Sequence, residues 1–233
     1  MFSKSAHLYD ALYSFKDYQQ ESETIINLLN KEHPGAKSII DIACGTAEHD
    51  KYLSKVYKVD GLDINPDFIK IASQKNPNGH YHVANMMNFS LNKTYDIILC
   101  LFSSIGYVKM LPNVIRTLQC FIHHLNKDGI IVVEPWFTPE TWNTDASVHM
   151  LIADTPDGKV CRMNLSAKKG TLSIVDFHYL VGSKNRIKHF TERHELGLFS
   201  VEEMKNAFKK VGLKVRYDPE GLTGRGLYIA HYL

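Results

Sequence analysis

An acidic residue four positions before a turn glycine is the most informative chemical feature of the sequence. Residues 41–47 read Asp-Ile-Ala-Cys-Gly-Thr-Ala, after the apolar run at 38–40 and before a segment with a helical pattern at 48–55. A strand, a glycine turn and a helix N-terminus begin a nucleotide-binding βαβ unit. A carboxylate at Asp41 would repel a pyrophosphate but attract an ammonium group, and Gly45 lets the backbone approach a ligand closely. The turn therefore favours a nucleoside with a cationic amino-acid end, of which S-adenosylmethionine (SAM) is the common example.

A second carboxylate supports a nucleoside ligand. Asp63 lies 22 residues beyond Asp41, the interval expected of a carboxylate that accepts hydrogen bonds from ribose hydroxyls. Proteins that bind NAD and proteins that bind SAM share this spacing, and a helix N-cap or a turn aspartate is the structural alternative. The turn supplies only the first glycine of a Gly-x-Gly-x-x-Gly fingerprint, which together with Asp41 predicts SAM. The stretch resembles motif I of class I methyltransferases, with Ala47 in place of the last glycine.

The elements that must position these residues alternate along the chain. Between positions 37 and 135, short runs rich in Ile and Val are separated by helical segments, the clearest with an apolar stripe from Leu111 to Leu125. This alternation predicts an α/β fold with a mostly parallel, Rossmann-like sheet and helices on both faces. Ligands bind at the carboxyl ends of such strands. The predicted cofactor contacts in this region are Asp41, Ala43, Gly45, Asp63, Ile64, Asn85, Met86 and Leu101.

The pattern changes after Pro135. Four longer runs with polar and apolar residues in alternation predict an antiparallel sheet inserted near 145–198. Ser200 and Glu203 form the pattern of a capping box, which opens a helix that ends near Val211. We expect one domain over 1–233, with lid helices at 1–30, a SAM-binding core at 37–136, the substrate-side insertion at 145–198, and a last helix and two strands at 200–233.

The composition is that of an ordinary globular protein. In 233 residues, 44% are hydrophobic and 22% charged, and the net charge of +2 gives no special attraction to nucleic acid or to a membrane surface. No apolar run reaches the length of a membrane span, and no signal sequence is evident. The four cysteines form no Cys-x-x-Cys pair, and the twelve histidines show no metal-ligand spacing. We expect a cytoplasmic protein without a metal site and without nucleic acid or membrane as a partner.

Several polar and aromatic residues have two possible roles. Tyr9 and Tyr18 either form a lid, because an aromatic face attracts a sulfonium cation, or pack the first long helix on the sheet. Asn85 either contacts the adenine edge, with Met86 on the ring, or is a plain turn residue. Residues 101–107 lack the Asn/Asp-Pro-Pro-Tyr/Phe motif with which methyltransferases of DNA and many RNAs hold a flipped base. A small-molecule acceptor is therefore favoured.

Blocks along almost the whole chain resemble the bacterial TDP-aminosugar N,N-dimethyltransferases, which complete desosamine- and mycaminose-type sugars. They are Leu-Tyr-Asp at 8–10, Lys-Asp-Tyr at 16–18, the turn at 41–46, Phe-Ser-Ser-Ile-Gly at 102–106, Val-Val-Glu-Pro-Trp at 132–136, Leu-Phe at 198–199 and Gly-Arg-Gly-Leu at 224–227. The resemblance implies SAM-dependent methylation of an amino group on a nucleotide-linked deoxysugar, usually twice, in a homodimer. Ala47, Asn85 and Tyr107 depart from the family's glycine, aspartate and histidine. The tyrosine bears on the proton acceptor and on the exact sugar.

Methyl transfer to nitrogen needs an in-line approach of a neutral amine, and positioning supplies much of the acceleration. A strong base is unnecessary, so no catalytic triad is expected. Tyr9 and Tyr107 are the candidates for orienting the amine or accepting its proton. Glu134 is either a further candidate on the substrate side or a structural acid at a strand end.

Three more residues are expected to contact the acceptor. Trp136 and Phe137 either stack on a thymine or pack in the core. The resemblance places Arg225 at the diphosphate, and a turn arginine paired with a surface carboxylate is the alternative. Other functions stay open: methylation of another small-molecule amine or hydroxyl, an NAD-linked oxidoreductase, and a non-catalytic SAM-binding protein. The sugar position and the number of methyl groups stay open too.

Overall fold

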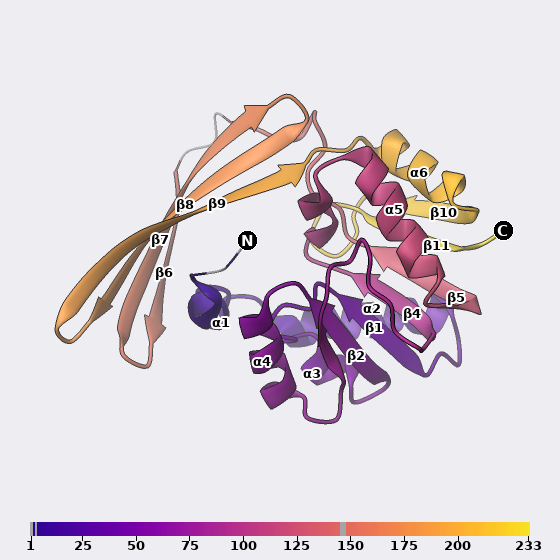
Figure 1. Cartoon of the computed structure of the whole chain (residues 1–233), viewed down its shortest axis with the longest axis horizontal. Helices are drawn as coiled ribbons and strands as arrows, with labels where there is room; N and C mark the ends of the chain where they lie inside the picture. Colours follow the sequence, from indigo (N-terminus) through magenta and orange to yellow (C-terminus); the bar gives the residue numbers. More distant parts are fainter. Residues whose placement is uncertain (1, 3, 145–147) are drawn as a thin grey trace.

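Two β-sheets and the helices packed on them make up the computed structural model, which describes residues 2, 4–144 and 148–233 (Figure 1). The larger sheet has the strand order β10-β11-β5-β4-β1-β2-β3. Its parallel strands are β1 (Ser38–Ile42), β2 (Lys58–Asp63), β3 (Tyr81–Val83), β4 (Tyr95–Cys100) and β5 (Leu125–Val133). Strand β11 (Leu227–Tyr232) runs antiparallel to β5 and to the edge strand β10 (Leu213–Asp218). The strand order reverses at β1, which is where ligands bind in open α/β sheets.

Helices cover both faces of this sheet because successive strand residues point to opposite sides. One face packs on α5 (Leu111–Ile122) and α6 (Val201–Lys210), through buried residues such as Leu118 and Phe208. The other packs on α2 (Tyr18–Glu32) and α3 (Asp50–Leu53). The predicted capping box is confirmed at the start of α6, where the Ser200 and Glu203 side chains bond reciprocally to the backbone.

The smaller sheet is the predicted antiparallel insertion, of which residues 145–147 lie outside the described part. Its strands follow in hairpin order: β6 (His149–Thr155), β7 (Gly158–Lys169), β8 (Leu172–Ser183) and β9 (Arg186–Gly197). In Figure 1 this sheet extends away from the parallel sheet, with the N-terminal segment between the two. That segment contains the 3-10 turn η1 (Ala6–Leu8) and α1 (Tyr9–Leu12), and Leu8 and Leu12 pack on Val160 and Tyr179 of the insertion.

Two predicted helices differ from the structure. The helix expected over 48–55 is reduced to the four residues of α3, because the turn before it is left-handed at Gly45 and Ala47 and the helix begins only at Asp50. The apolar stripe expected to reach Leu125 ends with α5 at Ile122. Leu125 instead starts β5, since the carbonyl of His124 accepts a hydrogen bond from the Tyr95 backbone at 2.8 Å and draws the chain into the sheet.

Candidate functional site

A cleft separates the carboxyl ends of the parallel strands from the inner face of the antiparallel sheet. One wall carries Ala43, Gly45, Asp63, Ile64, Asn85 and Met86, and the opposite wall carries Val175, Phe177, His194 and Leu196. A smaller pocket on the same turn is lined by predicted residues from the lid and from two strand ends: Tyr9, Tyr18, Asp41, Ala43, Gly45 and Leu101. The structure therefore brings together, at two adjoining pockets, every residue predicted to contact the cofactor.

The turn after β1 leaves room for a ligand between its backbone and the Asp41 side chain. Ala43 and Ala47 have φ of 59° and Gly45 has φ of 57°, so the chain folds back sharply around an open space. Apart from its two chain neighbours, a methyl group on Gly45 would meet no atom of the described residues within 4 Å. The Asp41 carboxyl is 3% exposed, and its Oδ1 has no hydrogen-bond partner among the described residues. A buried acceptor beside an empty turn fits a ligand with an ammonium group.

The charge around Asp41 supports the same assignment. Burial and the neighbouring carboxyl of Asp50 raise the pKa of Asp41, because two buried carboxylates repel each other. Tyr81 donates a hydrogen bond to Asp50 at 3.0 Å and holds it in place. A cation bound beside Asp41 would offset both the desolvation and the repulsion, so this pocket favours a positively charged group.

Asp63 connects the end of β2 to the turn. Its carboxylate accepts hydrogen bonds from the backbone of Gly45 at 3.1 Å and of Asn65 at 2.8 Å. It is not the cap of α4 (Pro66–Lys75), because Asn65 occupies the N-cap and accepts from the Asp67 backbone at 3.0 Å. The N-cap alternative for Asp63 is therefore wrong, whereas the bond from the Asn65 backbone, two residues on, is that of a turn aspartate. Asp63 also lines the cleft, so its carboxylate lies where a bound ligand could reach it.

The next strand ends complete this wall. Asn85 accepts a hydrogen bond from the Met87 backbone at 3.0 Å through its carbonyl oxygen, which fixes the orientation of the side-chain amide. Met86 lines the cleft beside it, and Ile64 is 42% exposed on the adjoining loop. An apolar surface next to a fixed amide is suited to a flat heterocycle.

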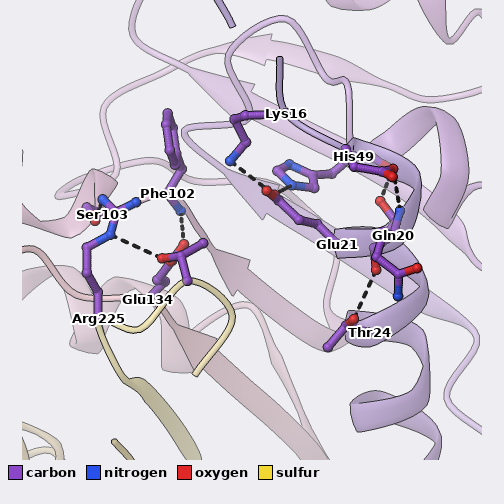
Figure 2. Close-up of polar contacts among 12 residues, drawn as sticks. Lys16, Gln20, Glu21, Thr24, His49, Phe102, Ser103, Glu134 and Arg225 are labelled. Carbon is purple, nitrogen blue, oxygen red and sulfur yellow. Dashed lines mark hydrogen bonds and ion pairs between the residues drawn. The ribbon is translucent and has the colours of Figure 1, made fainter. Parts of the chain in front are cut away.

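The N-terminal segment is fixed to the turn by polar contacts. Asp10 of α1 accepts hydrogen bonds at 2.6 Å from Thr46 in the turn and from Lys75 at the end of α4. Farther along, Lys16 lies 3.0 Å from the carboxylate of Glu21 and 3.9 Å from the centre of the Phe102 ring (Figure 2). The segment therefore spans the cleft and carries Tyr9 into both pockets. Burial raises the pKa of Tyr9, so its hydroxyl stays protonated.

Glu134 does not face the cleft but holds together the loop after β4 and the loop before β11. These two loops, with residues 135–137 after β5, are called the opposite rim. The Glu134 carboxylate is 2% exposed and accepts hydrogen bonds from the Phe102 backbone at 2.6 Å and from Thr223 Oγ1 at 2.5 Å. Arg225 in turn donates to Thr223 Oγ1 at 3.1 Å and to Ser103 Oγ at 2.9 Å. Figure 2 shows Glu134 and Arg225 at this junction. The arrangement is the structural one that the sequence left open for Glu134.

Arg225 lies in the cleft without a carboxylate partner. In the part of the chain that the structure describes, its guanidinium forms no ion pair, whereas the turn-arginine alternative required one. The guanidinium carbon is 5.9 Å from the centres of the Trp136 and Phe137 rings. Trp136 lines the cleft and donates to Ser173 Oγ at 2.8 Å, while Phe137 packs edge-on behind it. An unpaired guanidinium beside an aromatic face is suited to a phosphorylated heterocycle.

A histidine that sequence reasoning missed also lies on the cleft wall. His194 of β9 is 2.6 Å from the Tyr107 hydroxyl through Nδ1. Burial lowers the pKa of His194 to about 3, and the charge of Arg162 contributes to the shift. It was one of twelve scattered histidines in the sequence. A signal was present, however, because the buried residues Glu192, His194 and Leu196 alternate along the strand.

Among the described residues, no helix combines the length and the apolar character that a membrane span requires. The same part of the chain also holds no group of three His, Cys, Asp or Glu side chains placed to bind a metal ion.

Comparison with known proteins gives matches over nearly the whole chain. A family model described as a methyltransferase domain matches residues 39–129. A dTDP-3-amino-3,6-dideoxy-alpha-D-glucopyranose N,N-dimethyltransferase of Streptomyces fradiae is 35% identical over 227 residues, which are 96% of this chain and 89% of that protein. The crystal structure of Streptomyces venezuelae DesVI superposes with a TM-score of 0.91 at 31% identity and 98% coverage of each chain. SAM-bound CalS10, an amino pentose methyltransferase from Micromonospora echinaspora, gives 0.86 at 27% identity and 97% coverage of each.

Proposed function

Because the chain belongs to the family of SAM-dependent TDP-aminosugar N,N-dimethyltransferases, we propose that it methylates the amino group of a TDP-linked deoxyaminosugar. The observation that carries this proposal is the pairing of two unlike groups at two adjoining pockets. A buried carboxylate, Asp41, lines the smaller pocket, and Arg225, whose guanidinium forms no ion pair with a described residue, lines the cleft. The first suits a cationic amino-acid group and the second an anionic diphosphate.

The parallel-sheet wall is proposed to hold SAM. Asp41 would pair with its ammonium group, and Asp63 would accept the ribose hydroxyls. Ala43 and Gly45 offer their backbone, while Leu101 and Tyr18 close the methionine pocket. The adenine would lie along Ile64, Asn85 and Met86. When bound there, SAM supplies a methyl group on a cationic sulfonium.

The opposite rim is proposed to hold the sugar nucleotide. Arg225 would bind the diphosphate, and Trp136 would stack on the thymine with Phe137 supporting its ring. Glu134 acts on this rim indirectly, since it fixes Thr223 and Thr223 fixes Arg225. The anion is then recognised by a side chain whose position is set before the ligand arrives.

The reacting groups meet where the two walls approach each other. Tyr9 and Tyr107 line the cleft there, with Phe68 and Phe177 around them. This apolar lining excludes water and favours the neutral amine, whose lone pair is the nucleophile. Orientation of that amine against the cofactor is the main source of rate, and positioning of this kind supplies on the order of 7–11 kcal/mol in favourable cases.

A homodimer through the antiparallel sheet is part of the proposal. The outer face of that sheet exposes Met150, Ile152, Met163, Leu165, Leu180 and Ile187, each between 44% and 75% exposed. The strand register brings Met150 opposite Met163 and Ile187 opposite Gly182, so these residues form one surface. Contiguous apolar surface of this kind marks a protein–protein interface. A second copy is its occupant, because the family resemblance implies a homodimer.

The cytoplasm is proposed as the compartment. All four cysteines are free thiols in the structure, and three, Cys44, Cys120 and Cys161, are only partly buried. Reduced thiols of this kind are typical of a reducing compartment.

A panel of acceptors with isotope-labelled SAM tests the proposal. We expect label in a TDP-linked deoxyaminosugar, with a product that carries two added methyl groups, and far less label in the free aminosugar or in a TDP-sugar whose amine is replaced by hydroxyl. Label in the hydroxyl sugar alone would point to an O-methyltransferase. Tight binding of NADH with no binding of SAM would contradict the proposal.

A further inference from the structure

His194 is a buried histidine of the insertion with a single polar contact at the cleft. The residue is 1% exposed, and its ring packs on Phe2 at 4.5 Å and on Phe177 at 4.9 Å between ring centres. Its Nδ1 is 2.6 Å from Tyr107 Oη, while its Nε2 has no hydrogen-bond partner among the residues that the structure describes. The ring is therefore held by packing, and one nitrogen is used to bind Tyr107.

The hydrogen shared by Tyr107 Oη and His194 Nδ1 belongs preferentially to one of the two atoms. Burial lowers the pKa of His194 to about 3 and raises the pKa of Tyr107, so both groups are neutral near pH 7. A phenol is a good donor, and an unprotonated imidazole nitrogen is a good acceptor. We therefore assign the Tyr107 O–H as the donor to Nδ1, an assignment that places the histidine's own hydrogen on Nε2.

This donation determines what the Tyr107 oxygen can offer to a ligand. Its one hydrogen is engaged by His194, which leaves only lone pairs for the cleft that Tyr107 lines. From these observations we propose that His194 is a positioning residue for methyl transfer, which makes the Tyr107 oxygen a hydrogen-bond acceptor for an N–H of the substrate amine. The proposal rests on the proposed function, because it requires an amine in this cleft.

The consequence for the amine is orientational. An N–H directed at Tyr107 fixes one bond of a tetrahedral nitrogen, so the lone pair must point away from Tyr107. A hydroxyl free to donate would instead engage the lone pair itself and remove the nucleophile. Both a primary and a secondary amine carry the required N–H, which fits two successive transfers. A neutral tertiary amine has none.

The first test separates rate from binding in four variants. His194→Phe keeps an aromatic ring but removes the acceptor, and we expect kcat to fall roughly tenfold with the SAM dissociation constant within about twofold of wild type. Tyr107→Phe should lose a similar factor. The double variant should be no slower than Tyr107→Phe alone, because the two residues act through one hydrogen bond. His194→Asn, whose side-chain oxygen can replace Nδ1 as an acceptor, should recover most of the rate.

A matched control and a spectroscopic measurement complete the experiment. His231→Phe changes an exposed strand histidine and should leave kcat unchanged. Nitrogen-15 NMR of labelled histidine should show the tautomer of His194 with hydrogen on Nε2, and Tyr107→Phe should shift its Nδ1 signal.

The outcomes distinguish this proposal from the proposed function. Wild-type kcat in His194→Phe, or additive losses in the double variant, would overturn the positioning role while methylation stands. Hydrogen on Nδ1 of the wild type would overturn it as well. If the tautomer is as expected but no TDP-aminosugar is methylated, the proposed function fails, and the positioning role fails with it.

Discussion

The two sheets of the molecule form the two walls of one cleft by different means. The parallel sheet contributes a compact turn, residues 41–47, in which backbone conformation and two nearby carboxylates create the pocket. The antiparallel sheet and its neighbouring loops contribute side chains that meet across long stretches of sequence, as Tyr107 and His194 do. The first wall needs little more than a local motif, while the second depends on how distant segments are arranged. We therefore expect changes in each wall to affect different ligands.

The largest effect is expected from Asp63→Ala on the parallel-sheet wall. The variant removes a charged acceptor of ribose hydroxyls and the bond to the Gly45 backbone, so SAM affinity should fall by ~1.5–3 kcal/mol. Calorimetric titration with SAM measures it, and Asp67→Ala, an exposed aspartate of α4, is the matched control. If the loss appeared in KM for the sugar nucleotide instead, the assignment of the walls would be reversed.

Arg225→Ala should give the next largest effect, on binding of the sugar nucleotide. Loss of the diphosphate contact should raise KM for the sugar nucleotide by roughly 10- to 100-fold, which is ~1.4–2.8 kcal/mol. The SAM dissociation constant and the melting temperature should barely change. Arg216→Ala is the control, because Arg216 pairs with Glu32 on the surface. A lower melting temperature with an unchanged KM would make Arg225 a structural residue and weaken the case for a nucleotide-linked acceptor.

A smaller effect is expected on stability at acid pH, and it belongs to the antiparallel wall. Since burial lowers the pKa of His194 to about 3, the unfolded chain binds a proton between pH 6.5 and 3 that the folded chain does not. The contribution of His194 to stability is therefore present above pH 6.5 and is lost as the pH falls, by about 1 kcal/mol from pH 6.5 to 5.5. Urea unfolding of wild type and of His194→Phe at both pH values gives the free energy of unfolding of each protein. The wild type should lose more of this free energy between pH 6.5 and 5.5 than the variant does. Parallel pH dependence in the two proteins would contradict the neutral histidine.

A substitution on the outer face of the insertion should have the smallest effect on ligand binding in the cleft. Ile152→Asp places a charge in the exposed apolar surface and should convert a dimer to monomers in sedimentation velocity. SAM affinity should stay within about twofold of wild type, because the parallel wall is complete in one chain. Wild-type protein that sediments as a monomer would remove the dimer from the account.

The difference between the walls also explains what the sequence could predict. Strand–helix alternation and the capping box at Ser200 depend on neighbours a few positions away, and these predictions are confirmed by the structure. The acidic residues of the turn are equally local, and their role toward a cofactor stays a prediction. His194, the partner of Tyr107, lies 87 positions away, and Ser103, which accepts one of the hydrogen bonds of Arg225, lies 122 positions away. No local pattern pairs them. Glu134 appears as an isolated acid in the sequence. Thr223, which donates a hydrogen bond to it, is brought near only by the order of the strands β4, β5 and β11.

Hydrogen–deuterium exchange with each ligand in turn tests the division between the walls most directly. SAM alone should protect the backbone of residues 41–47 and of the loop after Asp63, and leave β8 and β9 unchanged. Addition of the TDP-aminosugar should then protect the inner strands of the insertion and residues 222–226. Protection of β8 and β9 by SAM alone, or no further protection by the sugar nucleotide, would contradict a cleft in which the parallel sheet holds the methyl donor and the antiparallel sheet faces the acceptor.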